Sequence, residues 1–341
     1  MKNFLIFSLL FAVLALAAGP KVIGYFPSWA QYSQFAPSDV RYGFLSEIRY
    51  CCLVPSDSEM LFADESDKAN FTELIRLSKA SGVRVFASVG GIGNEGAMAG
   101  ISNESLIAAA KNFAGEHGID GFEIDGGAVD ESGAKKVVEL AEALSDAGIA
   151  VSIALPGEAS LSGAVSASAA QKFDALSLWF TDQMDANQGS VKPNSNTSEN
   201  ISILAAFANA GIPKEKLIAI VPFYGKTFEG AKSLGASFTG KGSGNDGVFQ
   251  YRDLMSKFGD ANAYKVSFDN ASQSEIAVGE YEIIVFNGIP SMQAIAKAVK
   301  NNGYGGVAAF DISGDHKEPI ISLLVSVGQI LRPEVNYKKK K

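Results

Sequence analysis

The stretch Asp120-Gly121-Phe122-Glu123-Ile124-Asp125-Gly126-Gly127 (residues 120–127) carries the most information about this chain. Successive side chains of a β-strand point to opposite faces. Glu123, Asp125 and position 127 are therefore predicted to share one face, at steps of about 6.6 Å. Two successive acids on an inward face are costly to bury without partners. This cost indicates a functional site at the end of the strand, with a hydrogen-bonded pair of core acids as the alternative.

This strand is one of eight short apolar runs that are rich in β-branched and aromatic residues. Most of them lack polar alternation, which is typical of parallel strands covered on both faces. The runs occupy residues 21–26, 47–54, 83–89, 119–125, 149–155, 174–180, 217–224 and 305–312. Helical patterns precede several of them, at 71–81, 105–117, 131–147, 198–210 and 291–301.

Eight strands that alternate with helices predict an α/β fold, a closed (β/α)₈ TIM barrel. An open, doubly wound sheet is the alternative, but no Gly-x-Gly-x-x-Gly follows the first run. The seventh and eighth runs lie unusually far apart, and the Gly-, Ser- and Asn-rich residues between them predict a small insertion at approximately 228–286. The barrel with this insertion would span 19–333, and a basic tail would follow at 334–341.

The first 18 residues resemble a signal peptide, because Lys2 precedes a short apolar run that ends in small residues. We therefore expect secretion, and the run is shorter than a membrane span requires. The formal net charge of −8 argues against nucleic acid as a partner. The four lysines at 338–341 could bind an anionic polymer or simply be solvated. Five Asn-x-Ser/Thr sequons are candidate glycosylation sites, at Asn70, Asn103, Asn196, Asn200 and Asn270.

The only two cysteines, Cys51 and Cys52, are adjacent in a predicted strand, so they cannot form a disulfide framework. They could be a buried pair of thiols or a disulfide between neighbours. The chain has two histidines, His117 and His316, and neither has a partner at metal-ligand spacing. We predict no metal site and no cofactor.

Six motifs in chain order resemble glycoside hydrolase family 18, the chitinases and chitinase-like lectins. The stretch at 120–127 resembles the Asp-Gly-x-Asp-x-Asp-x-Glu signature of that family. The other five are GYFPSW (24–29), SVGG (88–91), FDALSLWFTD (173–182), VPFYGK (221–226) and GGVAAFDISGD (305–315). Each motif is weakly specific alone, but together they cover nearly the whole mature chain. The resemblance implies a TIM barrel that acts on GlcNAc polymers.

Family members use the acetamide of the sugar as the nucleophile, and the last Glu of the signature protonates the leaving oxygen. Gly127 stands at that position, so the resemblance assigns no catalytic residue here. General acid catalysis alone contributes roughly 10²–10⁴-fold. Asp130 or Glu131 on the following loop could act as a substitute acid. Glu123 replaces the first inner Asp of the family, whereas Asp125 is retained and could bind an acetamide.

Three further changes fall on the subsite of the reacting sugar. Trp179 and Thr181 replace a Met and a Tyr, and Phe310 replaces the Trp under the sugar. Aromatic faces stack on pyranose rings, and acids accept their hydrogen bonds. The candidate carbohydrate-binding residues are Tyr25, Trp29, Asp125, Trp179, Asp182, Tyr224 and Phe310. Ser88 resembles the residue that hydrogen-bonds the inner acid, Glu123 in this chain.

Some of these rings have another interpretation. Tyr25 and Phe310 could only fill the barrel interior, and Trp179 could plug the pocket. The favoured hypothesis is a secreted, catalytically inactive chitinase-like lectin that binds chitin or GlcNAc-containing glycans in the barrel mouth. The alternatives are a weak or altered endo-glycosidase and a structural or signalling barrel without sugar binding. The sequence leaves the oligomeric state open.

Overall fold

The computed structural model describes residues 19–335, apart from residues 58, 63, 182–188 and 261. The predicted signal peptide, Asp182 and the lysines at 338–341 lie outside the described residues. None of the helices in the described part of the chain is long and apolar enough to cross a membrane.

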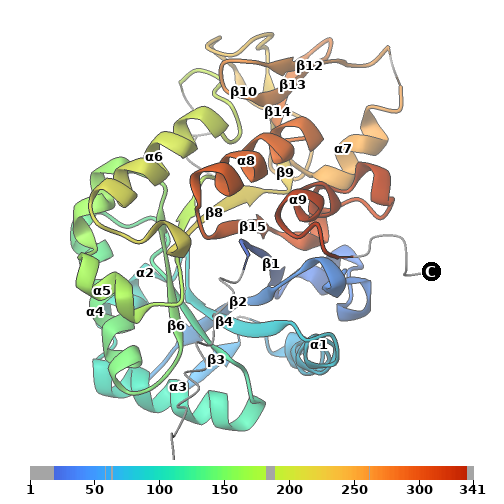
Figure 1. The fold of residues 1–341 in the computed structure, drawn as a ribbon. Coiled ribbons are helices and arrows are strands. Elements are labelled where there is room, and N and C mark those ends of the chain that lie inside the picture. The colour runs from blue at the N-terminus through green and yellow to red at the C-terminus, as the bar shows by residue number, and fades with distance from the viewer. Residues whose placement is uncertain (1–18, 58, 63, 182–188, 261, 336–341) are drawn as a thin grey trace, which may run out of the picture.

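Eight parallel strands form a closed barrel, so the prediction of a (β/α)₈ TIM barrel is confirmed (Figure 1). The barrel closes because the first strand pairs with both the second and the last. The barrel strands are β1 (Lys21–Pro27), β2 (Glu47–Pro55), β4 (Arg84–Gly90), β5 (Gly121–Asp125), β6 (Val151–Pro156), β7 (Leu176–Trp179), β8 (Leu217–Pro222) and β15 (Gly306–Phe310). Each of them overlaps one of the eight predicted runs. A short strand that was not predicted, β3 (Met60–Phe62), pairs antiparallel with β2 outside the barrel.

Helices surround the barrel and bury apolar side chains against it (Figure 1). They are α1 (Lys68–Ala80), α2 (Glu95–Gly100), α3 (Asn103–His117), α4 (Glu131–Asp146), α5 (Ala167–Lys172), α6 (Thr197–Asn209), α8 (Ile289–Asn302) and α9 (Leu323–Leu331). Side-chain caps fix several starts: Asp130 accepts a hydrogen bond from the Gly133 amide at the start of α4 (2.9 Å). Where such a cap is present, it fixes the residue at which the helix begins and hence where the preceding strand-to-helix loop ends.

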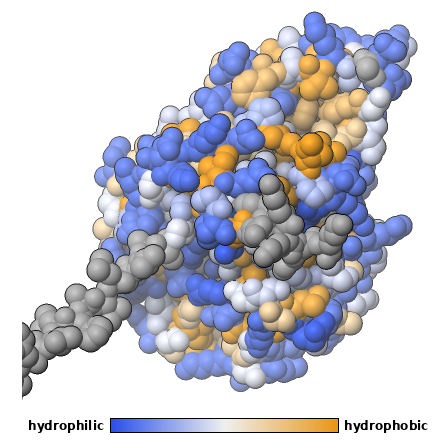
Figure 2. Space-filling model, turned by 45° about the vertical axis from the view of Figure 1, so that its right-hand side comes forward, coloured by the Kyte–Doolittle hydropathy of each residue, from blue (hydrophilic) through white to orange (hydrophobic). Residues whose placement is uncertain are grey.

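A second, antiparallel sheet lies between β8 and β15 in the chain, in the region of the predicted insertion. Its strands are β9 (Tyr224–Glu229), β10 (Gly240–Lys241), β11 (Val248–Gln250), β12 (Lys265–Asp269), β13 (Ser274–Val278) and β14 (Glu282–Phe286), with one helix, α7 (Tyr251–Lys257). The sheet therefore begins at Tyr224, four residues before the predicted start. It projects from the barrel at the top of Figures 1 and 2, and hydrophobic residues reach its surface.

Candidate functional site

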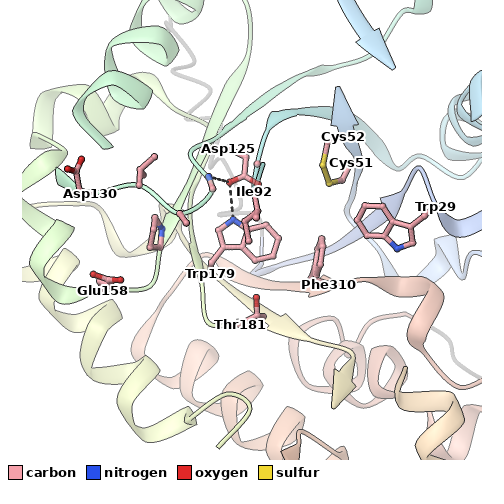
Figure 3. Close-up of a pocket in the computed structure, with 15 residues that line it drawn as sticks. Trp29, Cys51, Cys52, Ile92, Asp125, Asp130, Glu158, Trp179, Thr181 and Phe310 are labelled. Carbon is pink, nitrogen blue, oxygen red and sulfur yellow. Dashed lines mark hydrogen bonds between the residues drawn. A yellow bond between two sulfur atoms is a disulfide. The ribbon is translucent and has the colours of Figure 1, made fainter. Parts of the chain in front are cut away.

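A cavity of about 510 Å³ opens at the carboxyl ends of the barrel strands (Figure 3). This volume lies within the usual range of small-molecule pockets, roughly 300–1,000 Å³. The lining residues come from seven barrel strands or from the loops that follow these strands, and β8 contributes none of them. The lining residues are Trp29, Cys51, Cys52, Gly91, Ile92, Asp125, Gly127, Ala128, Val129, Asp130, Pro156, Glu158, Trp179, Thr181 and Phe310. The cavity therefore lies where TIM barrels place their functional sites.

Asp125 is the innermost acid of the cavity, and its side chain is only 3% exposed. Its Oδ1 accepts hydrogen bonds from the Gly127 amide (3.0 Å) and from Nε1 of Trp179 (3.1 Å), both drawn in Figure 3. Burial, with the nearby charge of Glu123, raises the pKa of Asp125 to about 7. The residue can therefore exist in either protonation state near neutral pH.

Gly127 lies beyond the end of β5, so the prediction that position 127 continues the strand is wrong. β5 ends at Asp125, and Gly127 has the left-handed φ of +63°. A Cβ atom on Gly127 would lie 2.9 Å from the carbonyl carbon of Gly91 and 2.8 Å from Oε1 of Glu95. Real Cβ atoms do not approach other atoms so closely. The loop is therefore built around the absence of a side chain at this position.

Glu95, a residue that the sequence did not single out, holds this loop from α2. One of its oxygens accepts a hydrogen bond from the Ala128 amide (3.3 Å), and the other from the Gly93 amide (2.9 Å). The carboxylate thus links the loop after β4 to the loop after β5. Glu95 lies next to position 127, and it is not among the residues that line the cavity.

Three aromatic rings line the cavity. Trp179 and Phe310 pack edge to face with ring centroids 4.7 Å apart, and Trp29 meets Phe310 at 6.2 Å. Trp29 is 41% exposed, so its ring is accessible to a ligand. Trp179 donates to Asp125 and forms part of the floor, and the cavity remains open above it. Trp179 therefore lines the pocket and does not fill it.

Two predicted sugar-binding residues lie elsewhere. Tyr25 is fully buried beneath the floor, where its ring contacts Trp179 and Phe310 at 5.5 Å each and its hydroxyl donates to Glu123. Tyr224 begins β9 and is not among the lining residues. Tyr25 therefore lies in the barrel interior, the location that the alternative interpretation gave it, and its hydroxyl is part of the polar interior.

The barrel interior below Asp125 contains a charge network that the sequence analysis missed. Glu123 accepts hydrogen bonds from Tyr25 (2.8 Å), from Ser88 (3.0 Å) and from Arg49. Arg49 is fully buried, and it also donates to Glu47 (2.9 Å) and to Ser177 (2.7 Å). Burial raises the pKa of Glu123, and Arg49 opposes that shift. Contact between Ser88 and the inner acid is as the family resemblance implied.

Alternation within β2 could have revealed Arg49. Glu47 and Arg49 are two residues apart in an otherwise apolar run, so they share one face. A lone ion pair on the face shared with the inner acids predicts a buried network. Glu158, an acidic lining residue that was not predicted, follows β6 and could be inferred only from the three-dimensional arrangement.

The proposed substitute acids are engaged elsewhere. Asp130 reaches the cavity rim, but its carboxylate caps α4 through the Gly133 amide. Glu131 forms an ion pair with Lys135 on the exposed face of α4 and does not line the cavity. In Figure 3 the Asp130 carboxylate lies at the far edge of the site from Trp179 and Phe310. Of these two residues, Asp130 alone lines the cavity, at its rim.

Cys51 and Cys52 form a disulfide, which settles the alternative left open by the sequence. No group of three or more His, Cys, Asp or Glu residues that could hold a metal occurs in the described ranges. Of the candidate glycosylation sites, Asn200 is 3% exposed and donates to Ser195 (2.8 Å), so the folded chain has no room for a glycan there. Asn270 is exposed, and Asn70, Asn103 and Asn196 are half-buried.

Proteins similar to this chain include chitinases and chitinase-like proteins, in agreement with the six motifs. The chitinase-like mite allergen Der f 18.0101 of Dermatophagoides farinae is 21% identical over 330 residues, which cover 87% of this chain and 71% of the allergen. A chitinase-like effector of Moniliophthora perniciosa is 22% identical over 377 residues, covering 89% of this chain and 86% of the effector. Among solved structures, the class V chitinase from Nicotiana tobaccum has a TM-score of 0.80 at 16% identity, covering 92% of this chain and 99% of that one.

The structural likeness shows a shared fold. The family described as Glycosyl hydrolases family 18 matches residues 21–315, which is most of the chain. With the barrel, the position of the cavity and the signature at 120–127, this match identifies the chain as a member of glycosyl hydrolase family 18.

Proposed function

We propose that this protein is a secreted, catalytically inactive chitinase-like protein that binds GlcNAc-containing glycans or chitin in the cavity. The observation that carries the proposal is the backbone at Gly127. The position that holds the proton donor in the family has no side chain, and its loop excludes one. An open cavity with aromatic walls and a deep carboxyl group remains. These two features together support sugar binding without cleavage.

Calorimetric titration with chitotetraose tests the binding part of this proposal. We expect saturable binding by the wild-type chain and at least about tenfold weaker binding by the double variant Trp29→Ala/Phe310→Ala, since each ring supplies stacking area. Ile320→Ala, an 85% exposed residue outside the cavity, is the matched control and should bind like the wild type. Absence of binding by the wild-type chain would favour a structural or signalling barrel without a sugar site.

Prolonged incubation with chitotetraose, followed by mass spectrometry of the products, tests the catalytic part. We expect no cleavage. A weak hydrolase is the second candidate function, and the deep position of Asp125 together with its pKa of about 7 favours it, since this group can carry a proton at neutral pH. Cleavage that disappears in Asp125→Asn would support that candidate. Cleavage that disappears only in Asp130→Asn would restore the substitute acid on the rim.

A further inference from the structure

The disulfide between Cys51 and Cys52 belongs to the wall of the cavity. Cys51 pairs with Pro27 of β1 and with Ser88 of β4, and the register between β2 and β4 shifts between Cys51 and Leu53. Cys52 is therefore the extra residue of a bulge at the mouth of the barrel. Bulges near functional sites change the direction in which side chains point. Both sulfur-bearing residues line the cavity, opposite the loop that carries Asp130 (Figure 3).

The sulfurs continue the apolar surface that the aromatic rings form. Cys51 lies in a buried cluster with Tyr25, and Cys52, Trp179 and Phe310 pack against this cluster. On the other side, the Cys52 sulfur is 3.9 Å from where a Cβ on Gly91 would lie, and an Asp125 oxygen is 3.2 Å from the same point. The disulfide therefore lies next to both the apolar rings and the deep carboxyl group.

Stabilisation of the fold does not account for this disulfide. In the chain-entropy description, a disulfide stabilises a protein more when it closes a longer loop. The sequence separation here is 1, so almost no loop is closed. Hydrogen bonds to β1 and β4 already hold β2 on both sides. The notable feature of this disulfide is therefore that it lies in the wall of the cavity.

We propose that the Cys51–Cys52 disulfide is a ligand-contacting surface on which the apolar C–H face of a pyranose ring rests, beside Trp29 and Phe310. This inference rests on the proposed function, because it deepens the same site. A disulfide is polarisable and has no hydrogen-bond donor, whereas two thiols have S–H donors and are free to separate. The affinity of the cavity for sugar therefore depends on the redox state of these two sulfurs.

The first experiment compares chitotetraose binding by the oxidised wild-type chain and by Cys51→Ala/Cys52→Ala, with Ile320→Ala as the control. We expect about fivefold weaker binding by the double variant, the effect of losing a few tens of Å² of apolar contact, and an unchanged melting temperature within a few degrees. A folded double variant with wild-type affinity would overturn the inference and leave the proposed function intact. A wild-type chain that does not bind would overturn both.

The second experiment requires no substitution and applies even if the double variant does not fold. A water-soluble phosphine reduces the disulfide: the S–S bond breaks, one water molecule supplies the hydrogens of the two thiols and the oxygen of the phosphine oxide, and the phosphine is oxidised. Maleimide trapping and intact-mass measurement follow the reaction with and without saturating chitotetraose. We expect the sugar to slow reduction several-fold, because it covers the sulfurs. Equal rates with bound sugar would show that the ligand does not contact the disulfide.

Discussion

At the residue scale, Gly127 determines whether catalysis can be restored by a single substitution. Gly127→Glu introduces a Cβ at a φ of +63° and within 3.0 Å of the Gly91 backbone. We therefore expect no hydrolysis of chitotetraose by this variant and a free energy of unfolding lowered by about 2 kcal/mol or more, measured by urea denaturation. A folded, active Gly127→Glu enzyme would contradict the proposal that the loop excludes the acid.

Two alanine variants separate the backbone effect from the effect of a charge. Gly127→Ala places only a methyl group at the crowded position and should lose about 1–2 kcal/mol. Gly96→Ala, in α2, is the matched control, because a Cβ there meets no atom within 4 Å and the residue has no left-handed φ. This control should be neutral or slightly stabilising, since alanine favours helix over glycine.

Asp125 should make stability depend on pH. Its folded pKa of about 7 lies above its ordinary value near 4, because burial disfavours the charged form. Its contribution to stability is therefore fully present below about pH 4 and is lost as the pH rises to about 7. Asp125→Asn should lose less stability between pH 4 and pH 8 than the wild type, by up to a few kcal/mol. Urea unfolding at both pH values measures the loss of unfolding free energy in each protein. Equal losses in the wild type and in Asp125→Asn would contradict the raised pKa of Asp125. Asp57→Asn, on the surface, is the control.

The missing carboxyl group at position 127 could be predicted from the sequence, but the shape of its loop could not. The prediction continues the strand alternation two residues beyond Asp125, to position 127. The pair Gly126-Gly127 is, however, a turn signal, and it indicates that the strand ends before it. The left-handed turn packs against Gly91, from the loop after β4, and against Glu95, from the start of α2. Likewise, Tyr25 and Trp29 belong to one motif, but only the structure shows that one is buried and the other faces the cavity.

At the scale of elements, β2 and β5 are joined across the barrel interior by the buried pair of Arg49 and Glu123. Arg49→Met leaves Glu123 without its cation and should lower the free energy of unfolding by about 3–5 kcal/mol. Arg49→Met combined with Glu123→Gln removes both charges of the pair and should recover part of that loss, since Glu47 also loses its bond to Arg49. Urea denaturation of the single and double variants measures the coupling. Losses that simply add would show that the two strands are not coupled through these charges.

The eight barrel strands could be predicted because parallel strands covered on both faces are continuously apolar. The second sheet could be predicted only as an insertion. Its strands are short and partly exposed, and β12 carries Val266 and Phe268 at the surface of an edge strand. Pro222 ends β8, and the chain enters the second sheet after a single residue, so the sequence showed one run up to Tyr224.

At the scale of the whole molecule, burial decides which sequons can carry a glycan. When the chain is expressed in a eukaryotic secretory host, we expect modification at the exposed Asn270 and none at the buried Asn200 in the folded product. Peptide mass mapping before and after enzymatic deglycosylation measures the occupancy. Asn270→Gln should lower the mass of the secreted chain by one glycan, and Asn200→Gln should not. A glycan at Asn200 of the folded protein would contradict the burial of that side chain.

The pairing of β1 with β15 joins strands from opposite ends of the described chain. A ribosome that synthesises this protein must therefore deliver residues up to Phe310 before the ring of strands can close. Until then β1 and β8 each present an unpaired edge, to which other chains can add. Loop-closure entropy makes this last contact slow to form. The nascent chain thus depends on protection from aggregation until its final barrel strand emerges, and fragments that lack β15 are expected to aggregate.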